Sequence, residues 1–191
     1  MTAESNHLSG KGILAGKRIL AVDDENDILE TIVDILDMAE VDTARDYDSA
    51  SAKIRTGRYD LAILDIMGVD GLTLLDEAVA MGIPTVMLTA HAVNPETLMA
   101  SIRKGAISYL PKETLIDLDD LLEALLGAQA AGKPPWKLLF DRLGGYFDER
   151  FGPDWKAKDE TFWSDFSRNW QVGRGIQARL KNDPRVRDIG V

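Results

Sequence analysis

Four short apolar runs, each of which stops on a polar or charged residue, constrain the fold of this chain more than any other feature. The clearest run is LAILD at 61–65, in which four apolar residues precede a carboxylate. Continuous apolar runs of this length are typical of strands that are covered on both faces in a parallel sheet. The other three runs are RILAVDD at 18–24, PTVMLT at 84–89 and ISYLPK at 107–112.

Helical patterns separate these runs. Apolar residues recur at helical spacing between Ile28 and Ala39, after a start that Asn26 or Asp27 can cap. Further helices are expected at about 49–55, 72–81, 95–104 and 115–126, and a weak edge strand at 41–46. This alternation of strands and helices predicts an α/β fold, a doubly wound sheet of five parallel strands.

The chemically active residues lie where the strands end. If the strands are parallel, Asp23, Asp24, Asp65, Thr89 and Lys112 converge on one edge of the sheet. Ligands of open α/β sheets bind at that edge, where the strand order reverses. Three neighbouring carboxylates repel one another unless a cation is present. Because the ligands are hard oxygens and the chain has no cysteine, the expected cation is Mg²⁺.

This set of residues predicts a site that accepts a phosphoryl group on a carboxylate. Asp65 is the expected nucleophile, since aspartate forms covalent phosphoryl intermediates in other proteins. Asp23 and Asp24 would hold Mg²⁺, while Lys112 and the Thr89 hydroxyl would contact oxygens of the product. Phosphoryl transfer depends mainly on such positioning and electrostatic stabilisation.

In these residues the chain resembles the receiver domains of two-component response regulators, over roughly residues 17–127. The resemblance rests on five elements in the family's order, namely Asp23-Asp24, Asp65, Thr89-Ala90, Tyr109 and Pro111-Lys112. It implies a flavodoxin-like (CheY-like) sheet with strand order 2-1-3-4-5 and a sensor histidine kinase as the phosphoryl donor.

The resemblance also implies roles for further residues. The backbone carbonyl of Met67 would join Asp23, Asp24 and Asp65 as a ligand of Mg²⁺. Thr89 and Tyr109 would form the switch, in which Thr89 moves toward the phosphoryl group and Tyr109 rotates inward. The loop after Asp65 departs from the family pattern, because it is shorter and lacks the usual proline.

Two other functions compete with this interpretation. One is a phosphohydrolase that uses Asp65 covalently, although such enzymes usually carry a second carboxylate two residues later, where Met67 stands. The other is a scaffold or dimerisation module that is never phosphorylated. We expect a phosphoacceptor protein and not an enzyme, with only self-phosphorylation and dephosphorylation as activities.

A change in composition near 130–135 (AAGKPP) predicts a domain boundary. We expect a flexible lead-in at 1–16, a receiver at 17–130 and a helical, aromatic-rich extension at 131–191. Every Trp and Phe of the chain follows the boundary: Trp136, Phe140, Phe147, Phe151, Trp155, Phe162, Trp163, Phe166 and Trp170. Two amphipathic helices are expected there, one ending before Gly152-Pro153 and one running from Asp159 toward Pro184. They would form either a hairpin with its own core or an extension packed on the receiver.

Charge and hydropathy limit the choice of partners. The net charge of −10 is concentrated before the boundary, so the receiver is not expected to bind nucleic acid. The basic residues near the carboxyl end do not form a dense recognition helix, so we expect no DNA binding there. They are Arg168, Arg174, Arg179, Lys181, Arg185 and Arg187. A homodimer through 92–126 or through the C-terminal helices stays open. The absence of a long apolar run predicts a cytoplasmic protein without a membrane segment.

Overall fold

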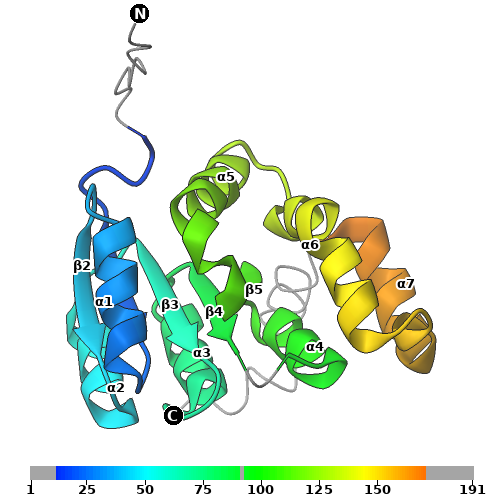
Figure 1. Cartoon of the computed structure of the whole chain (residues 1–191), viewed down its shortest axis with the longest axis horizontal. Coiled ribbons are helices and arrows are strands. Elements are labelled where there is room, and N and C mark those ends of the chain that lie inside the picture. Colours follow the sequence, from blue (N-terminus) through cyan, green and yellow to red (C-terminus); the bar gives the residue numbers. More distant parts are fainter. Residues whose placement is uncertain (1–11, 91–92, 171–191) are drawn as a thin grey trace, which may run out of the picture.

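The computed structural model describes residues 12–90 and 93–170, and its centre is one parallel sheet (Figure 1). The strand order is β2-β1-β3-β4-β5, which confirms the predicted fold class and topology. The strands are β1 (Arg18–Val22), β2 (Glu40–Ala44), β3 (Leu61–Asp65), β4 (Thr85–Thr89) and β5 (Ser108–Pro111). Every residue of β3, β4 and β5 is buried, as expected for strands that are covered on both faces.

Five helices cover the sheet. They are α1 (Asn26–Ile35), α2 (Tyr47–Thr56), α3 (Gly71–Ala80), α4 (Pro95–Lys104) and α5 (Leu118–Ala130). The chain moves from β1 to β2 in one direction and from β2 to β5 in the other. Because such crossovers are right-handed, α2, α3 and α4 lie on the face opposite α1, and α5 returns to pack beside α1.

Two helix starts test the capping predictions. Asn94 caps α4 as expected, since its side chain accepts a hydrogen bond from the Thr97 amide at 2.9 Å. The prediction for α1 was wrong, because its N-cap is Glu25 and no side chain caps it. The predicted helix at 115–126 also starts differently, with a 3-10 helix η1 (Lys112–Asp117) before α5.

The structure describes the chain from residue 12, within the segment predicted as a flexible lead-in. Leu14 is fully buried, and the amides of Ile13 and Leu14 donate to the Glu123 carboxylate of α5 at 2.8 and 3.0 Å. The segment at 12–16 is thus held by a residue that lies 110 positions after Ile13 in the sequence. Residues 1–11 of the predicted lead-in lie outside the described residues.

The aromatic-rich segment folds back onto the receiver. It contains α6 (Pro135–Phe151), a 3-10 helix η2 (Trp155–Asp159) and α7 (Glu160–Asn169), and we call residues 135–170 the extension. In Figure 1 the extension lies beyond β5 and α4, and α6 contacts both β5 and α5. The helix thereby covers the β5 edge of the sheet, which limits edge-to-edge association. The helix predicted from Asp159 toward Pro184 ends earlier, at Asn169, because Trp170 adopts a left-handed conformation with φ of 49°. The rest of the predicted helix, from residue 171, lies outside the described residues.

The extension has an aromatic core of its own, and it also packs against the core of the receiver. The sequence left open a hairpin with its own core and an extension packed on the receiver, and both descriptions apply. Phe140 contacts the rings of Trp163 and Phe166 within the extension. The Phe147 ring packs against Tyr109 of β5 with 6.1 Å between ring centroids. A homodimer through the surface of 92–126 would therefore compete with the extension for part of this surface.

Within residues 12–90 and 93–170, no helix is both long and apolar enough to cross a bilayer.

Candidate functional site

The carboxyl ends of four strands bring the predicted site residues together. Asp23 follows β1, Asp65 ends β3, Thr89 ends β4 and Lys112 follows β5. The register places these ends side by side, because Asp65 pairs with Leu88 and Thr89 with Pro111. A small pocket of about 170 Å³ opens between them. Its lining residues are Asp24, Glu25, Asp65, Met67, Gly68, Ala90 and Lys112.

Three carboxylates form the acidic part of the site. Ligand oxygens of Asp23, Asp24 and Asp65 all lie within 4.8 Å of one another. Asp23 and Asp65 are buried, whereas Asp24 is exposed and faces the pocket. Carboxylate oxygens in this number and spacing match the ligand chemistry that Mg²⁺ prefers. The residues present therefore fit the predicted ion.

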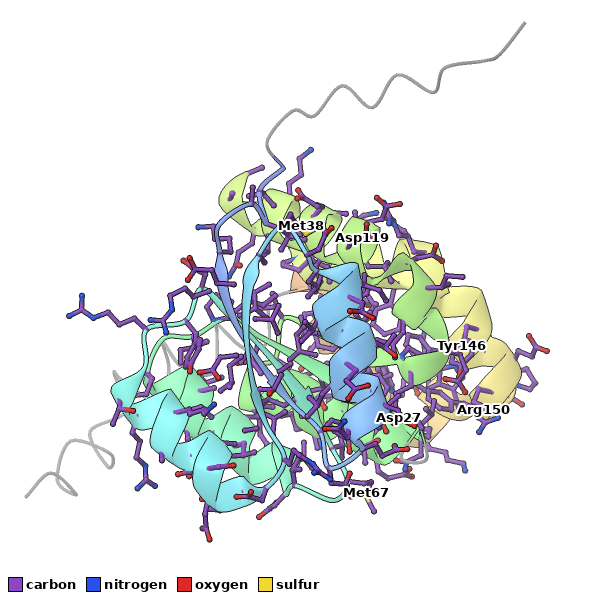
Figure 2. The ribbon with its side chains drawn as sticks, turned by 60° about the vertical axis from the view of Figure 1, so that its left-hand side comes forward. Asp27, Met38, Met67, Asp119, Tyr146 and Arg150 are labelled. Atoms are coloured by element: carbon purple, nitrogen blue, oxygen red, sulfur yellow. The ribbon has the colours of Figure 1, made fainter. Side chains whose placement is uncertain are left out.

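Met67 lies at the rim of this pocket. Its side chain is 57% exposed, and Figure 2 shows it at the edge of the molecule, beyond the loop that follows β3. A role in metal binding would therefore fall to its backbone carbonyl oxygen and not to the thioether.

Lys112 is the cation of the site, and it is shared among three carboxylates. Its Nζ atom lies 2.8 Å from Asp23 Oδ2, 2.8 Å from Glu25 Oε1 and 3.7 Å from Asp65 Oδ1. Burial alone would lower the pKa of Lys112, but the hydrogen bonds to Asp23 and Glu25 outweigh burial and raise it. Glu25 was missing from the predicted site, although its position directly after the acidic pair was a usable signal.

Asp65 sits in an environment that disfavours its negative charge. Burial and then the neighbouring charge of Asp23 raise its pKa to about 7, and Lys112 offsets only part of this rise. Burial and the repulsion among the carboxylates therefore both raise the proton affinity of Asp65, the predicted acceptor.

We expect the ionisation of Asp65 to lower the stability of the metal-free protein. Its pKa is higher in the folded protein than in the unfolded chain, so its stabilising contribution is complete below about pH 4. This contribution is lost as the pH rises through about 7. Asp65→Asn, which cannot ionise, should therefore exceed the wild type in stability at about pH 8, by on the order of 1–2 kcal/mol.

Urea denaturation in the presence of a chelator, at about pH 5 and pH 8, measures this difference in free energy of unfolding. We expect a larger difference at the higher pH. A difference that stays constant between the two pH values would contradict the assignment.

Gly68 lets the short loop after Asp65 lie against Asp24. Its φ is +77°, and a Cβ atom there would lie 2.5 Å from the Asp24 carboxylate. We expect Gly68→Ala to cost about 1 kcal/mol in stability and to displace Asp24. Titration calorimetry with Mg²⁺ should then show a loss of affinity of about tenfold or more.

Gly82→Ala is the matched control for this substitution. Gly82 has a similar φ of +74°, but a Cβ atom there meets nothing within 4 Å. It should lose similar stability and keep its affinity for Mg²⁺. Equal affinities in the two variants would show that the contact with Asp24 does not matter.

The two predicted switch residues are both buried. Thr89 and Tyr109 each have 0% exposure. The Tyr109 hydroxyl lies 2.9 Å from Thr97 Oγ1, and burial raises the pKa of Tyr109 to about 12. The Tyr109 ring is buried where α6 covers β5, with the Phe147 ring packed against it, and its inward rotation on phosphorylation stays a prediction.

Comparison with known proteins identifies the family to which this fold and site belong. A family model described as the response regulator receiver domain matches residues 19–126. The chain belongs to this family.

Regulators from distant organisms resemble the receiver. The two-component response regulator ARR12 of Arabidopsis thaliana is 32% identical over 124 residues, covering 61% of this chain and 21% of that protein. The transcriptional regulatory protein TcrA of Mycobacterium tuberculosis is 32% identical over 130 residues, covering 65% and 50%. The crystal structure of a CheY-like receiver domain protein from Methanospirillum hungatei JF-1 is 30% identical with a TM-score of 0.54, covering 61% of this chain and 99% of that one.

The family model covers the receiver alone. The match to the family model ends at residue 126, before the extension begins. The chain spans between about a fifth and a half of the length of these two curated relatives.

Proposed function

We propose that this receiver accepts a phosphoryl group from a sensor histidine kinase on Asp65 and that the modification changes its contacts with other proteins. The observation that carries the proposal is the position of Asp65. Its buried carboxylate lines a pocket that opens to solvent, within reach of two further carboxylates and the Lys112 ammonium. This set of groups offers a nucleophile, a cation site and a contact for phosphoryl oxygens in one place.

The chemistry follows from these positions. An Asp65 oxygen attacks the phosphorus of the donor, a P–O bond forms, the P–N bond to the donor imidazole breaks, and the imidazole leaves with a proton. Lys112, which lies 3.7 Å from the Asp65 carboxylate, is close enough to contact an oxygen of the transferred group. The Thr89 hydroxyl would contact another. Mg²⁺ bound by Asp23, Asp24, Asp65 and the Met67 carbonyl would neutralise charge on the phosphoryl oxygens.

Incubation of the full chain with acetyl phosphate and Mg²⁺ tests the proposal. We expect one phosphoryl group per chain, in an adduct that is stable in acid and labile in base. A phosphohydrolase would release phosphate continuously without an accumulated adduct. A scaffold would show neither, and beryllofluoride, a mimic of the phosphoryl group, would leave its spectrum unchanged.

The structure supports the phosphoacceptor over the phosphohydrolase at one position. Met67, where such enzymes usually carry a second carboxylate, turns its side chain out to solvent. The proposal therefore describes a signalling protein without turnover of an external substrate. It also places this protein in the cytoplasm.

The predicted absence of DNA binding stays part of the proposal. Five of the six basic residues named for the carboxyl end lie at 174–187, outside the described residues, so their arrangement does not bear on the prediction.

A further inference from the structure

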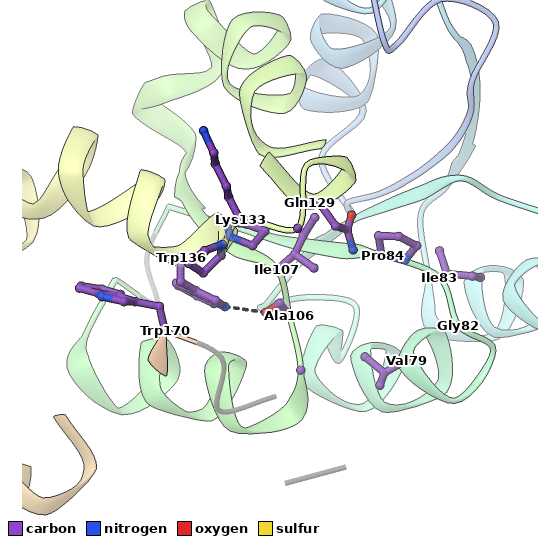
Figure 3. Close-up of a pocket in the computed structure, with 14 residues that line it drawn as sticks. Val79, Gly82, Ile83, Pro84, Ala106, Ile107, Gln129, Lys133, Trp136 and Trp170 are labelled. Carbon is purple, nitrogen blue, oxygen red and sulfur yellow. Dashed lines mark hydrogen bonds between the residues drawn. The ribbon is translucent and has the colours of Figure 1, made fainter. Parts of the chain in front are cut away.

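The extension occupies the surface formed by α4, β5 and α5, and it is attached there at two separate points. The first is Trp136, at the start of α6. Its indole Nε1 donates a hydrogen bond to the Ala106 carbonyl between α4 and β5 at 2.8 Å. Figure 3 shows this bond beside a pocket of about 220 Å³ that lies between the receiver and the linker to α6. Packing at this end of the joint is therefore incomplete.

The second point is tightly packed and involves a predicted switch residue. Phe147 of α6 and Tyr109 of β5 are both fully buried, and their rings are in contact. Tyr146, the next residue of α6, packs against Phe147 with 5.7 Å between ring centroids. Docked α6 therefore contributes, through Phe147, to the burial of the Tyr109 ring.

Tyr109 also reaches the segment that follows the site. Its hydroxyl is bonded to Thr97 Oγ1 at 2.9 Å and to the backbone of Asn94. Both residues belong to the start of α4, and Asn94 lies five positions after Thr89 at the end of β4. One side chain thus joins the start of α4, which follows the phosphoryl site, to the extension.

The strength of α6 docking, compared with the usual strength of coupling between two sites, indicates in which direction this connection can act. Docked α6 has three large apolar side chains buried, Trp136, Leu139 and Phe147, and the burial of apolar surface strongly favours the docked state. Coupling between two sites typically changes an affinity by only about 5- to 150-fold. A phosphoryl group at Asp65 is therefore not expected to expel the extension, whereas the docked extension can bias the site.

We propose that the extension acts as an intramolecular clamp, which holds the start of α4 through Phe147 and Tyr109 and so raises the affinity of the Asp65 site for a phosphoryl group. The physical reason is preorganisation, because a segment that is already ordered loses less conformational entropy when the ligand binds. This inference rests on the proposed function. In this proposal the extension is a positive regulator of the receiver. A partner protein that loosened α6 would lower the phosphorylation of Asp65.

The test uses the full chain and beryllofluoride with Mg²⁺. Phe147→Leu loosens the cover over Tyr109, and Thr97→Val removes one of the partners of its hydroxyl. Each should weaken beryllofluoride binding by about 5- to 10-fold, measured by titration calorimetry. The control is Phe166→Leu, a change at an equally buried phenylalanine whose ring contacts lie within the extension, and it should bind as the wild type does.

Tryptophan fluorescence supplies an independent readout. All four tryptophans lie beyond residue 135, so their emission reports on the extension alone. Because coupling is reciprocal, beryllofluoride should reduce acrylamide quenching of tryptophan in the wild type. This protection should shrink in Thr97→Val, which also decides the question if Phe147→Leu fails to fold.

The outcomes separate this inference from the proposed function. A wild type that does not bind beryllofluoride with Mg²⁺ would overturn both. Binding that Phe147→Leu and Thr97→Val leave unchanged would overturn the clamp alone. Tighter binding in these variants would also overturn it, since the extension would then oppose the phosphoryl group.

Discussion

Replacement of Asp65 by asparagine should abolish the phosphoryl adduct that acetyl phosphate produces. The amide is uncharged and a poor nucleophile, so no other atom at the end of β3 can form the P–O bond. We expect a loss of about 100-fold or more in adduct formation, measured by intact mass after acid quenching. Because this variant should be more stable than the wild type at about pH 8, unfolding would not explain the loss.

Asp70→Asn is the control for this prediction. Asp70 lies five residues after Asp65 and has a left-handed backbone conformation with φ of 52°, which asparagine also tolerates. Its adduct should match that of the wild type. An undiminished adduct in Asp65→Asn would assign the acceptor role to another carboxylate, and the proposed function would then need a different nucleophile.

Gly71→Ala should destabilise the protein by about 3 kcal/mol or more. A Cβ atom at Gly71 would lie 1.8 Å from the backbone carbonyl oxygen of Asp65. Backbone atoms cannot rotate away from such a collision as a side chain could. Either α3 or the end of β3 has to shift, and a shift of β3 also displaces the predicted phosphoryl acceptor. Urea denaturation measures the loss of stability.

Gly144→Ala makes the same chemical change at a site without neighbours. Gly144 lies inside α6, and a Cβ atom there meets nothing within 4 Å. Because alanine favours the helix, this variant should gain about 0.5–1 kcal/mol. If Gly71→Ala had the same free energy of unfolding as the wild type, the contact between the start of α3 and Asp65 would be looser than the structure indicates.

The fold was largely predictable because its signals are local. A strand such as LAILD shows its burial in its own composition, and the Asn94 cap is a short-range hydrogen bond. The convergence of Asp23, Asp65 and Lys112 could be inferred as well, since parallel strands place their carboxyl ends on one edge.

The missed features depend on residues far apart in the sequence. Glu123 holds the segment at 12–16 through two backbone amides, and no local pattern at either position predicts this contact. The ion pair between Glu25 and Lys112 joins residues separated by 87 positions, and its only local signal is the place of Glu25 directly after the acidic pair. Such contacts exist only once the sheet has formed.

The amino-acid sequence by itself determined the order of strands and helices, the residues at the strand ends and the separate composition of the aromatic segment. Each of these features depends on residues that are neighbours along the chain. Only the tertiary structure decided that α6 lies against β5 and that Phe147 rests on Tyr109. The physical reason is that an amphipathic helix specifies an apolar face and not the surface that will cover it. The surface of the folded receiver determines where the apolar face of α6 packs.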